Sequence, residues 1–339
     1  MIPNFLKSLF YATGLLDLFH QVRNRHTLTV VMFHRVLATK DPRWNTCDPD
    51  YTIEVSAFAD CLDFFEKHYS LVSLRQVLEA QGGGSRLPPC SLLLTFDDGW
   101  ADNVEYALPL MRQRGTPGAI FVVADAVGRD APFFQEQLMG AWRSGRLSPA
   151  AIATAVRAHA PHLPEVMNDD FSSIRRLIRV VEALDPASRE RLMGALSLEL
   201  VDGHRHMVTT TELVELEAGG VAVGVHGKTH LPMTAVTDLD AELSGARNQM
   251  AAMLRGTHRP ACMSFPHGQY DQSIASRARD AGFELLFTSV PCINLSGPAR
   301  SRLLGRLGFS AAEMLDGRGA LAPYKLAMYL FFRARQCLS

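Results

Sequence analysis

The sequence lacks any apolar run long enough to cross a bilayer, which takes about 20 consecutive apolar residues. It also lacks an excess of charge of either sign, since charged residues make up 20% of the 339 residues and the formal net charge is -1. This near-neutral balance gives no electrostatic reason to expect nucleic-acid binding. A chain of this length with 47% apolar residues can bury a large core without disulfides or metal, and we expect an ordinary globular enzyme.

The six cysteines show no C-x-x-C spacing and therefore indicate neither a zinc ribbon nor a tight disulfide framework. We expect small, buried, reduced thiols in a cytoplasmic protein, although an even number leaves extracellular pairing open. No secretory signal with an unbroken apolar middle and an A-x-A cleavage site precedes the first predicted strand. The cysteines are Cys47, Cys61, Cys90, Cys262, Cys292 and Cys337.

Four short apolar segments each run into polar residues. Continuous apolar runs of this kind are typical of strands buried on both faces of a parallel sheet. In parallel α/β barrels the catalytic residues project from the C-terminal ends of strands, so the recurrence predicts one shared site. The segments are 27–33 before His34, 91–96 before Asp97 and Asp98, 221–225 before His226, and 261–265 before Pro266 and His267.

Two of these strand ends carry residues that could bind a metal ion. A zinc-type cation takes histidine nitrogen and carboxylate oxygen, and a catalytic site needs three protein ligands with one position open. Asp98, His226 and His230 would supply them, which leaves Asp97 to accept a proton from water. The alternative is that Asp97-Asp98-Gly99 forms an ordinary turn and that the two histidines form a surface pair.

The motif TFDDG at 95–99, with H-x-x-x-H at 226–230, resembles the polysaccharide deacetylase family, the NodB-like carbohydrate esterases of the family 4 type. The resemblance runs from about Thr27 to about Phe309 and is interrupted by an insertion. It implies an α/β fold, a distorted (β/α) barrel, with Asp97 as general base and Asp98, His226 and His230 as ligands of one divalent cation. We expect zinc, although the same donors accept cobalt, nickel or iron.

Removal of an acetyl group from an amine also needs a general acid, and two histidines compete for this role. His34, in the segment 32–36, resembles the Tyr-His segment near the start of those family members whose late histidine motif has moved to the front of the barrel. We therefore favour His34, although a histidine at a strand end can also be purely structural. His267 is the other candidate, at a position where the family usually has an aromatic residue.

The resemblance implies further substrate contacts around Pro266, His267 and Gly268, where the family commonly uses a backbone N–H after the proline to stabilise an oxyanion. The arginine usual in this third motif is not evident. Arg259 lies just before the strand, and Arg306 lies on what we predict to be the last barrel strand. An arginine beside Asp97 would lower the pKa of the carboxyl and keep it ionised, and a surface location is the alternative for either arginine.

Aromatic residues near the predicted site are candidates for sugar contacts. Trp44 lies in a polar loop after His34, and Trp100 directly follows the aspartate motif. Phe133, Phe134 and Trp142 begin a helix-periodic segment that we predict to be a helical insertion over 130–208, forming one wall of the substrate cleft. These three residues could instead pack the insertion against the barrel.

We predict an N-terminal amphipathic helix over 1–26, a barrel over 27–310 and a helical tail over 311–339. Both ends are amphipathic, and the tail is basic, so they could dock on their own domain or lie on the anionic inner face of a membrane. The function we expect is deacetylation of an N-acetylated polysaccharide, oligosaccharide or lipid-linked glycan. The alternatives are an O-acetyl esterase or small-amide hydrolase with the same site, and a catalytically silent carbohydrate-binding barrel.

Overall fold

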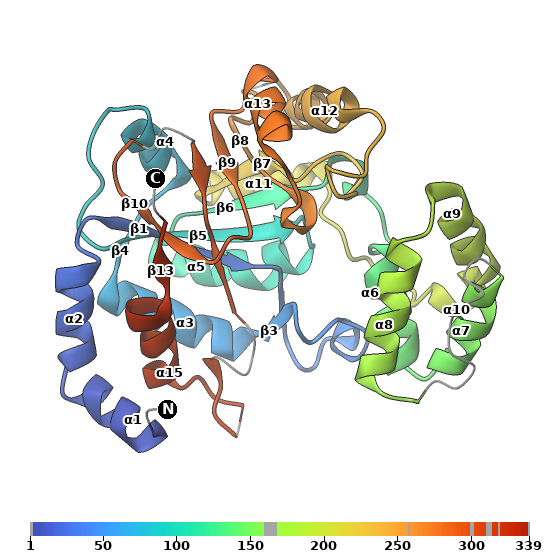
Figure 1. The fold of residues 1–339 in the computed structure, drawn as a ribbon, viewed down its shortest axis with the longest axis horizontal. Helices are drawn as coiled ribbons and strands as arrows, with labels where there is room; N and C mark the ends of the chain where they lie inside the picture. Colours follow the sequence, from blue (N-terminus) through green and yellow to red (C-terminus); the bar gives the residue numbers. More distant parts are fainter. Residues whose placement is uncertain are drawn as a thin grey trace.

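The computed structural model describes residues 3–158, 168–256, 258–298, 302–309, 314–317 and 319–337. Most strands form one mainly parallel sheet, in which β1, β5, β6, β7, β8 and β9 pair in that order (Figure 1). The strands of this sheet are β1 (Thr27–Phe33), β4 (Ser70–Leu71), β5 (Ser91–Asp98), β6 (Gly118–Val122), β7 (Val221–Val225), β8 (Cys262–Ser264), β9 (Leu285–Phe287), β10 (Cys292–Leu295), β11 (Leu303–Leu304), β12 (Leu307–Gly308) and β13 (Arg335–Gln336).

One short segment closes this sheet into a barrel. Its first half, β11, pairs in parallel with β9, and its second half, β12, pairs in parallel with β1. Gly305 and Arg306 lie between the two halves. The predicted α/β fold, a distorted (β/α) barrel, is therefore confirmed, and the distortion arises because the closing strands are only two residues long.

The barrel strands are buried on both faces, as their continuous apolar sequences predict. In β1, Leu28 and Val30 pack in one cluster with Phe121 and Phe287, whereas Val31 packs in the cluster that contains the helices around the barrel. The surrounding helices are α3 (Val55–His68), α4 (Leu74–Gln81), α5 (Leu108–Arg114), α11 (Thr210–Ala218), α12 (Ala246–Met253) and α13 (Gln272–Asp280). A separate pair of strands, β2 (Arg35–Leu37) and β3 (Thr52–Glu54), follows β1.

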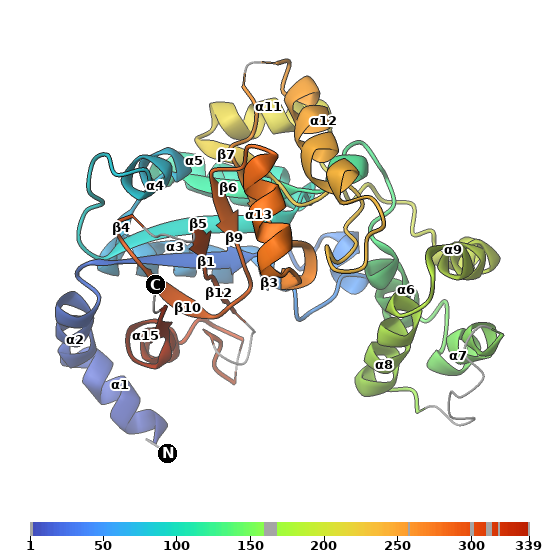
Figure 2. The same cartoon turned by 45° about the horizontal axis from the view of Figure 1, so that its top comes forward.

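The segment 130–208 forms several short helices that stand apart from the sheet, at the opposite end of the molecule from the chain termini (Figures 1 and 2). They have a small core of their own, to which α8 contributes Ile174, Leu177, Ile178 and Val181 at helical spacing. Residues 159–167 of the predicted insertion lie outside the described residues. The helices are α6 (Phe134–Arg143), α7 (Pro149–Arg157), α8 (Phe171–Glu182), α9 (Pro186–Ala195) and α10 (Ser197–Leu200).

The N-terminal segment forms two helices rather than the one that we predicted, α1 (Asn4–Ala12) and α2 (Leu15–Arg23). Gly14 separates them with a φ of 75°, a left-handed conformation that ends a helix. The C-terminal segment forms α15 (Pro323–Ala327), the π-helix η6 (Met328–Arg333) and β13. Positions 310–313, 318 and 338–339 lie outside the described residues. No described helix is long and apolar enough to cross a membrane.

The two ends of the chain pack against each other. Arg23 Nη1 donates to the Phe331 carbonyl at 2.8 Å, and Nη2 donates to the Ala334 carbonyl at 2.7 Å. The ring of the fully buried His20 stacks on Phe331 with 4.2 Å between ring centres. At least part of each terminal segment therefore docks on its own domain.

The prediction that every cysteine is unpaired is wrong for one pair. Cys292 and Cys337 form a disulfide, because β13 pairs with β10 and brings their Cα atoms to 5.4 Å. They are 45 positions apart in the sequence, which is why their spacing did not reveal the bond. The other four cysteines are free and buried, as expected.

Protonation of His20 is expected to destabilise the fold in mild acid. Burial lowers the pKa of His20 from 6.5 to about 4, so between these two values the unfolded chain binds more protons than the folded chain. The free energy of unfolding therefore falls as the pH falls, and the His20 contribution is about 2 kcal/mol between pH 7.5 and pH 5. Urea unfolding at a series of pH values measures it.

His20→Gln is the informative variant for this prediction. Glutamine can still donate to the His68 carbonyl, which lies 3.2 Å from His20 Nε2, but it does not titrate. The variant should show a shallower loss of stability with falling pH, whereas His26→Gln, at an exposed position, should match the wild type. An unchanged pH dependence in His20→Gln would contradict the assignment.

Candidate functional site

The three predicted metal ligands lie together at the C-terminal ends of two barrel strands, β5 and β7, between which β6 lies. Asp98 ends β5, and His226 and His230 follow β7. Asp98 Oδ1 lies 3.5 Å from His226 Nε2 and 3.2 Å from His230 Nε2, and the possible ligand atoms all lie within 4.8 Å of one another. Donor atoms about 2.0–2.2 Å from a tetrahedral zinc lie about 3.3–3.6 Å apart, so these spacings fit one cation.

Neighbouring groups orient two of these side chains. His226 Nδ1 lies 3.0 Å from the Ser264 carbonyl, and since a carbonyl only accepts, Nδ1 carries the proton and the Nε2 lone pair faces Asp98 and His230. The indole N–H of Trp100 donates to Asp98 Oδ2 at 2.9 Å, which leaves Oδ1 toward the histidines. Burial lowers the pKa of His226 to about 4, so this imidazole is in the neutral form that binds metal.

Left-handed backbone conformations are concentrated at this site. Asp98, His230 and His267 have φ values of 79°, 66° and 55°, which non-glycine residues seldom adopt. Gly227 also has a positive φ of 71°, and a Cβ there would lie 3.0 Å from Glu242 Oε2. That oxygen accepts hydrogen bonds from the N–H groups of 228 and 229, so Glu242 holds the loop that carries His230.

Asp97 forms a two-point ion pair with Arg306. Arg306 Nη1 lies 2.6 Å from Asp97 Oδ1, and Nη2 lies 2.6 Å from Oδ2. Both residues are buried, and Ser264 Oγ lies 2.6 Å from Arg306 Nη2. Burial by itself would raise the pKa of Asp97, but Arg306 outweighs it and the pKa is lowered. Arg306 is thus the arginine beside Asp97, whereas Arg259 is exposed at the surface.

A cavity of about 580 Å³ lies over these groups. Besides Asp97, Asp98, His226 and His230, its lining includes His34, Trp100 and His267. The ring of His34 lies 5.0 Å from that of Tyr51, which also lines the cavity. His34 therefore faces the same space as Asp97.

Other predicted contact residues lie elsewhere. Trp44 lines a neighbouring cavity of about 540 Å³ and not this one. Pro266 and Gly268 are not part of the lining, and the Gly268 N–H donates to the Phe265 carbonyl at 2.9 Å. His267 does line the cavity, but its Nε2 lies 3.0 Å from the His230 carbonyl and must donate to it.

Several residues of the site were not predicted from the sequence. Tyr51, Ser264 and Glu242 carry no motif, and only the fold places them next to the predicted groups. The helices α6 and α8 line the cavity with charged and polar side chains, so the predicted wall does lie there. These side chains are Gln135, Glu136, Arg175, Arg179 and Glu182.

Comparisons with known proteins agree with this architecture. The family model described as Polysaccharide deacetylase matches residues 85–159 and 199–286, which include the four Asp and His positions at the ends of β5 and β7. The unmatched residues between these two ranges include α8 and α9 of the insertion. His34 and Arg306 lie outside both matched ranges. Among curated proteins no match is found.

Solved structures show the same fold at low sequence identity. Streptococcus pyogenes deacetylase PplD in complex with acetate is 12% identical, with a TM-score of 0.57 and coverage of 90% of this chain and 99% of that one. IcaB from Ammonifex degensii is 18% identical, with a TM-score of 0.56 and coverage of 90% and 97%. A de-N-acetylase from Aggregatibacter actinomycetemcomitans is 17% identical, with a TM-score of 0.52 and coverage of 83% and 94%. With its family match, its fold and its candidate metal site, the chain belongs to the polysaccharide deacetylase family.

Proposed function

We propose that this protein is a metal-dependent hydrolase that removes N-acetyl groups from an amino sugar in a polysaccharide, oligosaccharide or lipid-linked glycan. The observation that carries the proposal is the Asp97–Arg306 ion pair next to Asp98, His226 and His230 in one cavity. The arrangement provides an ionised carboxylate and a three-residue cation site at the same point. A purely carbohydrate-binding barrel would not require the ion pair to lie there.

Asp98, His226 and His230 would hold the cation, with zinc expected and cobalt, nickel or iron as alternatives. Such a cation polarises the acyl carbonyl and lowers the pKa of water. Asp97 accepts the proton of the attacking water on a carboxylate oxygen. Arg306 keeps this carboxylate ionised and fixes its orientation through two hydrogen bonds, so that no reorganisation is needed when the proton arrives.

His34 donates the proton that the leaving amine requires. It faces the cavity, and no hydrogen bond of its ring is found among the described residues. His267 suits this role less well, because its Nε2 proton is already donated to the His230 carbonyl. The main-chain N–H of His267 remains the group proposed to stabilise the oxyanion, and Trp100 and Tyr51 would contact the sugar.

Acetate release tests the proposal. The metal-stripped protein is incubated with N-acetylglucosamine oligosaccharides, with and without added zinc or cobalt, and with O-acetylated saccharides in parallel. We expect release from the N-acetyl substrates only when metal is present. Release only from O-acetylated saccharides would identify an esterase, and stoichiometric metal binding without any release would support the silent binding barrel.

Peripheral membrane contact through the terminal helices is the second part of the proposal. Seven large apolar side chains on α1, α2 and η6 are between 39% and 74% exposed, and Lys7, Arg23 and Arg25 accompany them. An apolar patch with basic residues is typical of helices that lie on anionic lipid. The apolar residues are Phe5, Leu9, Leu15, Leu18, Phe19, Val22 and Phe332.

Flotation with anionic liposomes is expected to carry the wild-type protein upward, and the double variant Leu18→Asp/Val22→Asp should remain at the bottom. Both side chains are more than 60% exposed, so the fold should be unaffected. The control Leu198→Asp/Val201→Asp changes two exposed apolar residues of the insertion and should float like the wild type. Failure of the wild type to float would reject membrane contact.

The cysteines bear on the compartment in two ways. The predicted cytoplasmic location agrees with the four free buried cysteines. The Cys292–Cys337 disulfide is more typical of an oxidising compartment. Either location is compatible with peripheral binding to a membrane surface.

A further inference from the structure

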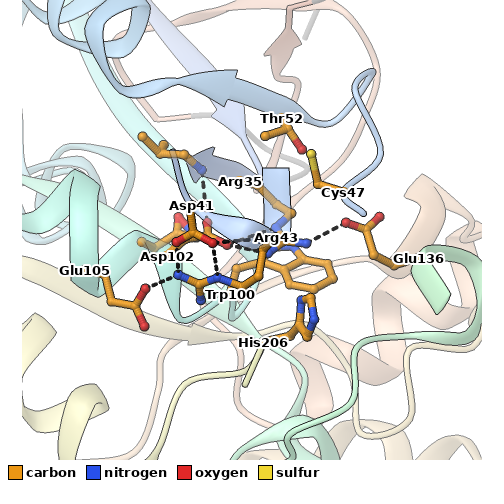
Figure 3. Close-up of polar contacts among 12 residues, drawn as sticks. Arg35, Asp41, Arg43, Cys47, Thr52, Trp100, Asp102, Glu105, Glu136 and His206 are labelled. Carbon is orange, nitrogen blue, oxygen red and sulfur yellow. Dashed lines mark hydrogen bonds and ion pairs between the residues drawn. The ribbon is translucent and has the colours of Figure 1, made fainter. Parts of the chain in front are cut away.

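The buried Arg35 connects three parts of the molecule close to the candidate metal site (Figure 3). Arg35 lies in β2 and is 1% exposed. Its Nε donates to Asp102 Oδ2 at 2.9 Å, and its Nη1 donates to Glu136 Oε1 at 2.6 Å. Asp102 follows β5, and Glu136 lies in α6, so one guanidinium group joins β2, the segment after β5 and the helical insertion.

The same guanidinium lies over Trp100. Arg35 Cζ is 4.3 Å from the centre of the Trp100 ring, a cation–π contact. The indole also forms a T-shaped contact with Phe133, with 5.5 Å between ring centres, and its N–H donates to Asp98 Oδ2. The orientation of Trp100 therefore depends on Arg35 on one side and on the start of the insertion on the other.

We infer that Arg35 is a positioning residue that orients Asp98 through the Trp100 indole, and that Glu136 makes this orientation depend on the docked insertion. With Oδ2 held by Trp100, Oδ1 faces His226 and His230. The inference rests on the proposed function, because it requires Asp98 to be a metal ligand. Contacts that orient a ligand typically change metal affinity by about 10–100-fold.

Arg43 provides a matched control within the same network. It is also buried, at 7% exposure, and it forms ion pairs with Asp41 and Glu105. Figure 3 shows both arginines, and among the described residues the cation that lies over the Trp100 ring is that of Arg35 and not that of Arg43. A variant of Arg43 therefore loses a buried ion pair with Asp41 and a partly exposed one with Glu105, without removing a contact to the indole that holds Asp98.

The test is a double-mutant cycle with zinc alone as the probe. The dissociation constant for zinc is measured by chelator competition in the full-length wild type, Arg35→Lys, Trp100→Phe and the double variant. Phenylalanine keeps the ring but lacks the N–H. We expect each single variant to bind zinc about 10–100-fold more weakly, and Arg35→Lys to cause no further loss in the Trp100→Phe background. The visible spectrum of bound cobalt should change in both single variants.

Arg43→Lys should lower the free energy of unfolding while binding zinc like the wild type. Additive effects of Arg35→Lys and Trp100→Phe would overturn the inference and leave Arg35 with a structural role alone. If Arg35→Lys does not fold, Glu136→Gln replaces it in the cycle with the same expectations. A wild type that binds no zinc, cobalt, nickel or iron would instead overturn the proposed function, and with it the inference, so the two failures are distinguishable.

Discussion

Asp97→Asn is expected to lower kcat for deacetylation by about 10²–10⁴-fold, the usual contribution of a general base, while the protein still binds one metal ion. Asparagine keeps an oxygen for one hydrogen bond from Arg306 but cannot accept the proton of water. The measurement is kcat at saturating metal together with the metal content of the purified variant. Asp97→Asn with full activity would show that Asp97 is not the base.

The variant also leaves the buried Arg306 without its carboxylate, and breaking a buried pair costs about 3–5 kcal/mol of stability. A control must therefore separate loss of folding from loss of chemistry. Asp41→Asn is a suitable control. Asp41 is also buried against an arginine, with its Oδ2 2.6 Å from Arg43 Nη2, and it does not line the cavity around Asp97. It should destabilise the protein to a similar degree and leave kcat unchanged.

His226→Gln is expected to abolish both metal binding and turnover. Glutamine can replace the hydrogen bond to the Ser264 carbonyl, but it offers no imidazole nitrogen to a cation. The loss of affinity should exceed the 10–100-fold that is typical when only an orienting contact is lost. Metal content after gel filtration with a chelator, followed by the acetate assay, measures both effects.

His20→Gln is the matched control for His226→Gln, since it also replaces a buried histidine but lies at the chain termini and not in the cavity. It should retain stoichiometric metal and full activity at neutral pH. Stoichiometric metal with unchanged affinity in His226→Gln would exclude His226 from the ligand set.

The location of the candidate site could be predicted because four apolar strands each end in polar residues. Parallel strands bring their C-terminal ends to one side of a barrel. If the four predicted strands form, the residues that follow them therefore lie near one another; these residues are His34, Asp97, His226 and His267. The chemical identity of the donors, two imidazoles and a carboxylate, then made a divalent transition metal the expected ligand. The cavity contains all four residues.

From the sequence we named Arg306 as the catalytic arginine, with Arg259 as the other candidate, but the sequence could not show which of them reaches Asp97. Arg306 lies on the predicted last barrel strand and Arg259 lies just before another predicted strand, but neither position shows which side chain reaches Asp97. Arg306 lies beside Asp97, 209 positions away in the sequence, because the segment containing it pairs with β9 on one side and β1 on the other. The closure of the barrel, a property of the whole sheet, decides the partner.

The positions of loop side chains also could not be predicted from the sequence. Trp44 lines the neighbouring cavity, since the direction of a loop side chain depends on what packs around it. The predicted single N-terminal helix is divided into two helices at Gly14. The apolar stripe in the sequence continues across this position, but the helical backbone conformation does not.

The sequence by itself determined the fold class, the strand ends that form the site, and the types of side chain that could bind a cation there, because strand periodicity and donor chemistry are local properties. Only the tertiary structure decided that Arg306 pairs with Asp97, that Cys292 pairs with Cys337, and that Arg35 and Glu136 connect the insertion to Trp100. Each of these contacts joins residues at least 45 positions apart, and such pairs meet only when the barrel closes and the insertion packs against it.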